Sequence, residues 1–273
     1  MRRLMEYSTG LESRRGRPVV LAQHCEVHEL AEGGHMHEGE WSSFLGIPGQ
    51  PSEAEELMVL RDIALSKMTG ARIHFQHLST LGSVQMVREA KAAGLPVTAE
   101  ATTHHFTLTD SACSCYDPVF KVHPPLRTES DVRAVKEGLA DGTIDAIATD
   151  HARHSRRSKE MSFDQAPPGM LGLETALSLS LEHSGLDLPE VLGLLSWQPA
   201  KIAGVDDRHG MTVERNNSAN LCVIDLDEKW TVSGKEMLSR SSNTPYEGWN
   251  LRGRVRHTIN NGRLVVFDGE SIK

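Results

Sequence analysis

Apolar and polar positions alternate between two kinds of pattern from residue 18 to about residue 200. Four short apolar runs are typical of buried strands: Pro18 to Gln23, Ala71 to Gln76, Leu95 to Ala99 and Ile144 to Thr149. Between these runs, apolar residues recur at the spacing of amphipathic helices. Strands that alternate with helices are typical of βα units, in which the strands run parallel. The pattern therefore predicts an α/β fold.

The helices are predicted from apolar periodicity and from the residues at their ends. The chain starts in a helix-like segment, and further helices are expected at Ser52 to Met68, Gly82 to Ala93, Glu129 to Ala140, Leu173 to His183 and Leu188 to Ala203. Ser52 and Glu55 have the spacing of a capping box, and Gly94 is placed to end the second of these helices. A long loop is expected between Asp110 and Thr128.

The pattern changes after Gly204. Short strands with Gly and Asn turns are expected at 220–225, 246–257 and 263–267. We therefore expect two parts: residues 1–204 form the α/β unit, and residues 205–273 form a small β-rich appendage.

The α/β unit has too few strands to close on itself. A closed (β/α)8 barrel of the TIM type is built from eight parallel strands, whereas four apolar runs are found here. Four strands alone would leave open edges and uncovered apolar faces. We expect a partial TIM-like barrel, about its second half, and we expect that an N-terminal half is absent from this chain.

Composition narrows the functional classes. The chain has 273 residues, 38% hydrophobic and 24% charged, as in folded globular proteins. A net charge of −8 without a basic stripe disfavours nucleic acid as a partner. No apolar run approaches the roughly 18 residues of a membrane span, and no signal peptide is evident. Only four cysteines are present, so a disulfide framework is not expected and the cytoplasm is the simplest location. Cys113 and Cys115 do not have the spacing of a zinc ribbon.

The candidate chemistry lies where three predicted strands end. His24, His77 and Asp150 each follow an apolar run, and the carboxyl ends of barrel strands meet at one mouth. Alone, each histidine is more often an ordinary polar residue, but the set of two imidazoles and a carboxylate suits Zn²⁺. Bound Zn²⁺ lowers the pKa of its water to about 7, and a carboxylate beside that water can accept its proton. The sequence therefore predicts a zinc-dependent hydrolase.

Other polar groups are weaker candidates. His154 lies on the loop after the fourth strand, where it could reach a substrate carboxylate. The loop Ala166 to Gly169 could present backbone groups to a planar ligand, or it could be a simple turn. His104 and His105 could support the ligands or be structural. The histidines of His35–His37 lie in a Gly-rich segment and are expected to be exposed.

Several stretches, taken in order, resemble dihydroorotases of the bacterial type I group within the amidohydrolase superfamily. The matching stretches are 22–26, 53–56, 77–80, 97–100, 104–106, 121–127, 148–154 and 163–174. The resemblance implies reversible, zinc-dependent cyclisation of N-carbamoyl-L-aspartate to L-dihydroorotate in pyrimidine biosynthesis. By position, His24 and His77 resemble ligands of one of two zinc sites. Asp150 resembles both a metal ligand and the general base.

The resemblance also implies substrate contacts, and it shows departures. His154 and the backbone at Pro168 and Gly169 resemble substrate-binding groups. His123 stands where the family has a substrate-binding Asn. The family's His-x-His pair, a nearby substrate-binding Arg and a bridging Asp are not found, so we expect the chain alone to have little or no activity.

Two further departures lie beside the candidate ligands. Arg153 replaces the usual Pro, and Val27 replaces a usual Asp.

Two alternatives remain. The chain could belong to another cyclic amidohydrolase, such as a hydantoinase or an allantoinase, which need not recognise the extra carboxylate of dihydroorotate. It could also be a non-catalytic dihydroorotase-like subunit that associates with aspartate transcarbamoylase. A homo-oligomer is compatible with either reading.

Overall fold

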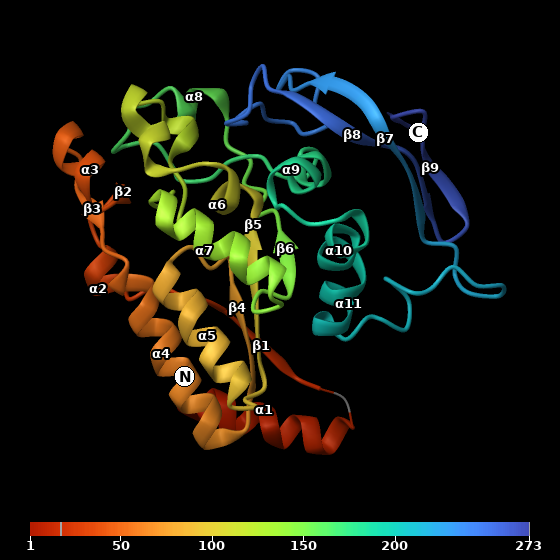
Figure 1. Cartoon of the computed structure of the whole chain (residues 1–273), viewed down its shortest axis with the longest axis horizontal. Coiled ribbons are helices and arrows are strands. Elements are labelled where there is room, and N and C mark those ends of the chain that lie inside the picture. The colour runs from red at the N-terminus through yellow and green to blue at the C-terminus, as the bar shows by residue number, and fades with distance from the viewer. Residues whose placement is uncertain (17, 273) are drawn as a thin grey trace.

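The computed structural model describes residues 1–16 and 18–272. Its central element is a parallel four-stranded sheet of order β1-β4-β5-β6 (Figure 1). The strands are β1 (Val20–His24), β4 (Arg72–Gln76), β5 (Val97–Thr102) and β6 (Ala146–Ala148). All four strands predicted from apolar runs are present. Their ends differ by a few residues, because β5 continues to Thr102 and β6 is short.

Helices cover one face of this sheet. They are α1 (Arg2–Arg15), α4 (Glu53–Thr69), α5 (Leu81–Ala92) and α7 (Glu129–Ala140), with neighbouring helices in contact (Figure 1). Side chains alternate along a strand, so Ile73 and Phe75 both point into the layer between sheet and helices. Both are at most 1% exposed and pack with Val59 and Val87. The apolar core of this unit therefore lies between the sheet and its helices.

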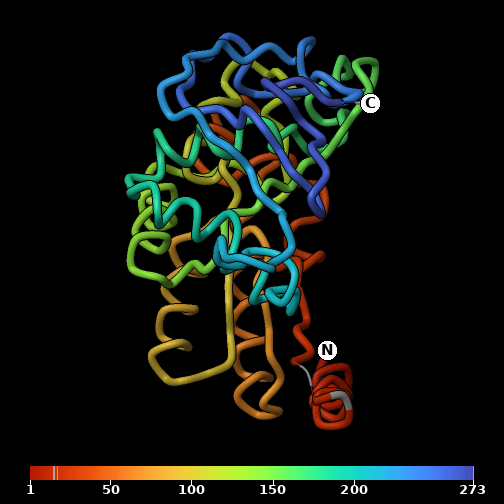
Figure 2. Tube along the Cα trace, turned by 90° about the vertical axis from the view of Figure 1, so that its right-hand side faces the viewer, coloured from red at the N-terminus to blue at the C-terminus, as the bar shows by residue number. Residues whose placement is uncertain are grey.

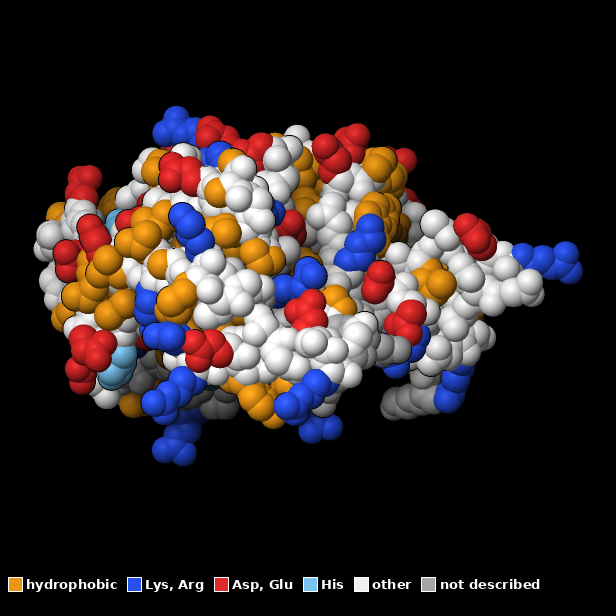
Figure 3. Space-filling model, turned by 90° about the horizontal axis from the view of Figure 1, so that it is seen from below, with side chains coloured by type: hydrophobic (Ala, Val, Ile, Leu, Met, Phe, Trp, Pro, Cys, Tyr) orange, Lys and Arg blue, Asp and Glu red, His pale blue; other side chains and the backbone are white. Residues whose placement is uncertain are grey.

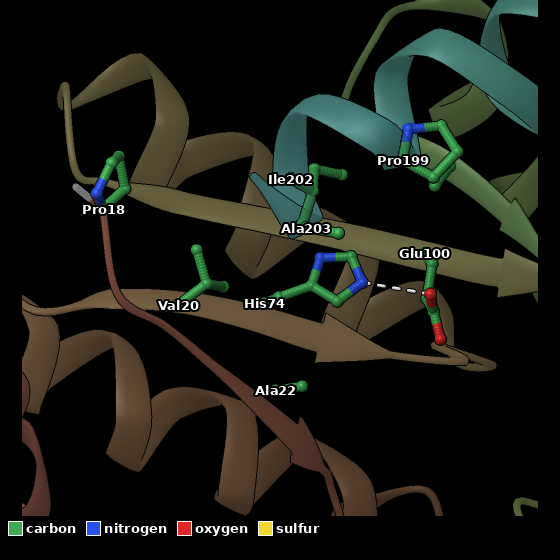
Figure 4. A pocket seen from close by; sticks show the side chains of 9 residues that line it. Pro18, Val20, Ala22, His74, Glu100, Pro199, Ile202 and Ala203 are labelled. Carbon is green, nitrogen blue, oxygen red and sulfur yellow. Dashed lines mark hydrogen bonds and ion pairs between the residues drawn. The ribbon is translucent and has the colours of Figure 1, made fainter. Parts of the chain in front are cut away.

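The opposite face of the sheet carries a polar pair in a cavity of about 360 Å³ (Figure 4). Nε2 of His74 lies 3.0 Å from Oε2 of Glu100, and its Nδ1 lies 2.9 Å from Oγ1 of Thr98. The cavity is lined by Pro18, Val20, Ala22, His74, Glu100, Ala146, Pro199, Ile202 and Ala203. Strand residues of this face are those that line the interior of a barrel, so the sheet has the two-faced character of a barrel segment.

The helices after β6 are more broken than the sequence indicated. They are α8 (Arg156–Lys159), α9 (Ala176–His183), α10 (Leu188–Leu192), a π-helical turn η3 (Gly193–Trp197) and α11 (Gln198–Ala203). The single helix expected from Leu188 to Ala203 is therefore divided. Pro199 lies in the first turn of α11 and has no N–H to donate, so the regular hydrogen-bond ladder cannot run through it.

The segment between β1 and α4 is more ordered than a Gly-rich loop. It contains α2 (His28–Ala31), β2 (Met36–His37), α3 (Glu40–Leu45) and β3 (Gly49–Gln50), and β2 pairs with β3 in parallel. The expectation of exposed histidines is wrong for His37, whose exposed fraction is 7%. Met36 packs with Cys113 and Phe163, so distant apolar residues bury this short strand.

The stretch from β5 to α7, which includes the long loop predicted between Asp110 and Thr128, also contains short helices. They are α6 (Thr103–Thr107), η1 (Asp110–Cys115) and η2 (Pro118–Phe120). These turns lead the chain from β5 back to the start of α7.

The C-terminal part is an antiparallel sheet of order β10-β9-β8-β7. Its strands are β7 (Leu221–Thr231), β8 (Asn250–Asn260), β9 (Arg263–Phe267) and β10 (Glu270–Ser271). Figure 2 shows this sheet at one end of the molecule and the N-terminus at the other. Tyr246 and Leu251 share a buried cluster with Leu126 and Leu179 of the α/β unit. The division at residue 204 remains a prediction.

The predicted capping box at Ser52 and Glu55 is wrong. The Ser52 side chain makes no cap hydrogen bond, and its φ of −60° and ψ of −33° are helical rather than extended. The carboxylate of Glu55 instead bonds to Ser79 and Thr80. Glu55 therefore bonds to residues distant in the sequence, and not to the start of its own helix.

Surface charge and helix hydropathy both bear on the expectations from composition. Basic and acidic side chains are interspersed on the face drawn in Figure 3, without a continuous basic stripe there. Among the described residues, no helix combines the length and the apolar character needed to cross a membrane.

Candidate functional site

Parallel pairing of β1 and β4 brings His24 and His77 together. His24 is the last residue of β1 and pairs with Gln76, so His77 directly follows its partner strand. Nδ1 of His24 lies 3.1 Å from Nε2 of His77. The ring centroids are 4.8 Å apart, with an interplanar angle of 72°. Two residues separated by most of a βα unit therefore form one imidazole pair at the mouth of the sheet.

His77 is held in an unusual conformation. Its φ is +35°, which non-glycine residues rarely adopt and which often marks a functional position. The residue is 8% exposed, and its Nδ1 is buried without a hydrogen-bond partner among the described residues. Burial lowers the pKa of His77, as does His24, whereas Asp150 raises it. The imidazole is therefore favoured in the neutral form, which is the form that binds metals.

His24 and Asp150 are the solvent-exposed residues of the candidate site. The His24 side chain is 46% exposed, and its Nε2 lies 3.6 Å from Oε2 of Glu26. Asp150 is exposed just beyond β6, and its φ is +42°. A solvent-open mouth with a carboxylate near an imidazole is typical of metal sites that keep a position for water.

The imidazole pair fits two corners of a zinc tetrahedron. Zn–N distances of about 2.0–2.1 Å would separate two ligand nitrogens by about 3.3 Å, close to the 3.1 Å between His24 and His77. Within residues 1–16 and 18–272, no group of three His, Cys, Asp or Glu side chains gathers closely enough to hold an ion. The spacing of His24 and His77 is therefore compatible with two metal ligands, and Asp150 does not complete a group of three with them among the described residues.

His104 and His105 form a directed chain of hydrogen bonds beside this pair. Nε2 of His105 donates to the carbonyl of Pro124 at 3.1 Å, so its Nδ1 accepts from Oγ1 of Thr102 at 2.8 Å. That oxygen in turn accepts from Nε2 of His104 at 2.8 Å. Burial lowers the pKa of His104 to about 3 and that of His105 well below its usual value. Each ring is thus neutral, and the chain fixes both tautomers.

His123 directly precedes Pro124 and is also neutral. Burial lowers the pKa of its imidazole to about 4. The side-chain amide of Gln50 donates to the carbonyl of Gly34 at 3.0 Å and lies 3.1 Å from Nε2 of His123. His123 Nε2 therefore accepts, and the ring proton resides on Nδ1.

The other predicted substrate contacts lie together, but their polar groups are engaged within the fold. Nε2 of His154 donates to the carbonyl of Pro168 at 2.8 Å. The amide of Gly169 donates to the carbonyl of Lys121 at 2.8 Å. A Cβ at Gly169 would lie 2.5 Å from Cβ of Ala152, so this position requires glycine. Their roles toward substrate remain predictions.

Two residues without an assigned role connect these segments. Arg127 is 3% exposed and donates to Oγ of Ser79, Nδ1 of His37 and the carbonyl of Gln50. Asn243, from the C-terminal part, donates to the carbonyls of Ala152 and Gly169. A buried arginine after a Pro-Pro-Leu run is a visible signal, whereas no sequence pattern marks Asn243.

Comparison with known proteins decides the family. A sequence profile described as the amidohydrolase family matches residues 32–265. The chain belongs to the amidohydrolase family. Amidohydrolases generally depend on metal ions, which agrees with an imidazole pair at the mouth of the parallel sheet. The chain is thus a member of a family of hydrolases, with its candidate site at the edge expected for an α/β enzyme.

Named relatives of this amidohydrolase refine the comparison. A dihydroorotase from Streptomyces coelicolor is 46% identical over 274 residues, covering 99% of this chain and 62% of the relative. One from Pelotomaculum thermopropionicum is 46% identical over 272 residues, covering 98% and 62%. The L-hydantoinase structure from Arthrobacter aurescens has a TM-score of 0.87 at 24% identity, covering 100% of this chain and 61% of that one, and so supports the fold. The chain spans about 62% of the length of these curated relatives.

Replacing Gly169 tests the packing of the amidohydrolase loop. We expect Gly169→Ala to lower the free energy of unfolding by about 2 kcal/mol or more, because φ is +129° and the new methyl would overlap Ala152. Gly142→Ala is the matched control, since φ there is +78° with no atom within 4 Å, and it should cost about 1 kcal/mol. Urea denaturation measures both. Equal losses would contradict the packing account.

The neutral histidines predict acid sensitivity. A histidine whose folded pKa lies at about 3 or 4, below the value of about 6.5 in the unfolded chain, binds fewer protons in the folded state. Its stabilising contribution is therefore present above pH 6.5 and is lost as the pH falls toward 4. We expect the free energy of unfolding to fall by about 1–3 kcal/mol between pH 7 and pH 5.

The variant His104→Gln isolates this effect, because it removes one such group. Its stability should depend less steeply on pH than that of the unaltered chain in urea titrations at both pH values. Identical slopes would show that His104 does not contribute.

Proposed function

We propose that this chain forms the larger part of a dihydroorotase and supplies one side of its zinc centre. The observation that carries the proposal is the His24–His77 imidazole pair at the mouth of the parallel sheet, with nitrogens 3.1 Å apart. It occurs in a chain 43–46% identical to curated dihydroorotases. The proposed reaction interconverts N-carbamoyl-L-aspartate and L-dihydroorotate.

The proposed metal is zinc, held by His24 and His77. Zinc, when bound, supplies an acidified water and polarises the carbonyl of the amide. Asp150 is the proposed third ligand from this chain, and the family resemblance calls for further ligands besides these three. Glu26, 3.6 Å from His24, is positioned to favour the orientation of that imidazole.

Asp150 is the proposed general base. Its carboxylate is exposed at the same mouth and near enough to His77 to raise the pKa of that imidazole against the effects of burial and His24. In hydrolysis, such a carboxylate accepts a proton from the attacking water and returns it to the leaving nitrogen. In cyclisation, the same carboxylate moves the proton in the reverse direction.

Substrate orientation is assigned to the segments around His123 and His154. The neutral His123 ring keeps its proton on Nδ1, so it can donate a hydrogen bond as an Asn amide would at this position. The His154–Pro168 hydrogen bond and the Gly169 packing shape the neighbouring wall. We propose that this wall faces the planar ring of the substrate.

The relatives favour dihydroorotase over a hydantoinase activity. The hydantoinase structures are at most 24% identical to this chain, which supports a shared fold and no substrate. Dihydroorotate has a six-membered ring with a carboxylate, whereas hydantoin has a five-membered ring without one, so substrate preference separates the two activities.

A chimera tests the proposal directly. The aligned segment of the Streptomyces coelicolor dihydroorotase, 46% identical over 274 residues, is replaced by this chain, and the purified chimera is assayed with Zn²⁺ on dihydroorotate and hydantoin. We expect a clear preference for dihydroorotate. We expect His77→Ala and Asp150→Asn each to lower kcat/KM at least about 100-fold, as loss of a ligand or a general base does.

His28→Ala is the control, because His28 is an exposed residue at the start of α2. It should leave kcat/KM within about twofold. A folded chimera that hydrolyses hydantoin but not dihydroorotate, or neither substrate, would contradict the proposal.

A further inference from the structure

Glu55 is a buried carboxylate with an unusual set of partners. It lies on α4, is 2% exposed, and accepts hydrogen bonds from the backbone amides of Ser79 and Thr80 at 3.0 and 3.2 Å. The hydroxyl of Ser79 donates to the same carboxylate at 2.5 Å. Charge-assisted bonds of this kind are stronger than neutral ones. Glu55 therefore clamps the turn that follows β4.

This turn begins with His77. The chain leaves β4 at Gln76, takes a positive φ at His77 and then enters α5 at Leu81. The amide of Leu78 bonds to the carbonyl of Glu100 at 2.9 Å, which fixes one side of the turn. The Glu55 carboxylate fixes the other side through the next two amides. A strained residue persists only where its surroundings hold it, and these two contacts hold His77.

Ser79 extends the clamp to a second segment. Its hydroxyl has one proton, which goes to Glu55, so its oxygen is free to accept from Nε of Arg127 at 3.1 Å. Arg127 also donates to the carbonyl of Gln50 at 3.0 Å, and the Gln50 side chain bonds to His123. A continuous set of hydrogen bonds therefore runs from Glu55 to the two sides of the candidate site.

We propose that Glu55 is a positioning residue that holds the His77–Thr80 turn so that the His77 imidazole meets His24, and that Ser79 and Arg127 couple this turn to His123. The inference rests on the proposed role of His77 in the metal centre. It assigns Glu55 no contact with metal or substrate. Its effect is on the placement of His77.

The test compares Glu55→Gln with a matched buried carboxylate. Asp62 lies on the same helix, is fully buried, and bonds to Arg61 rather than to the turn. Each full-length variant is studied by amide hydrogen exchange, by NMR of the imidazole nitrogens, and by titration with Co²⁺ as a spectroscopic probe for zinc. We expect Glu55→Gln to speed exchange at Ser79 and Thr80 at least about tenfold, to shift the His77 signals and to weaken Co²⁺ binding. Asp62→Asn should lower stability without these effects.

Ser79→Ala is a milder second variant, which keeps the backbone amide bonds to Glu55 and removes the two hydrogen bonds of the hydroxyl, one to Glu55 and one from Arg127. It should leave the Thr80 amide protected and speed exchange around His123. If Glu55→Gln and Asp62→Asn behave alike at the turn and at His77, the inference is overturned. If the unaltered chain takes up no Co²⁺, the proposed metal centre fails, whereas amide exchange and imidazole signals still decide the role of Glu55.

Discussion

The candidate site depends on the parallel register between β1 and β4. His24 pairs with Gln76, and this places His77 beside the end of β1. A slip of one residue would turn the side chains of one strand to its other face. His24 would then point toward the helical layer, and the imidazole pair would be lost. The core packed around Phe75 therefore stabilises the register on which the site depends.

The histidines in and around the pair differ in environment, and the roles proposed for them follow this difference. His104 is fully buried and neutral, with a fixed tautomer, whereas the His24 side chain is 46% exposed. A buried neutral imidazole donates from one ring nitrogen and accepts at the other, so its hydrogen bonds fix the segments that it contacts. An open ring next to a buried one leaves room for an ion and for water. The site thus combines a rigid wall with an accessible mouth.

The sequence indicated the regular elements well and the tertiary contacts poorly. α7 occupies the predicted range Glu129–Ala140, because its apolar periodicity and Thr128 cap are local signals. The sequence also predicts that His24, His77 and Asp150 lie at strand ends, and that these ends meet because parallel strands share one mouth. The spacing of Ser52 and Glu55 predicts a local cap, but the partner of Glu55, Ser79, lies 24 residues away. Likewise, His37 is buried by packing around Met36 that no nearby pattern reveals.

Zinc X-ray absorption of the chain loaded with one equivalent of Zn²⁺ tests the central claim most directly. The account predicts nitrogen and oxygen neighbours at about 2.0–2.1 Å with imidazole scattering. It also predicts that this scattering is lost when His24 and His77 are both replaced by alanine. Sulfur neighbours at about 2.3 Å, or an unchanged spectrum in the double variant, would contradict it.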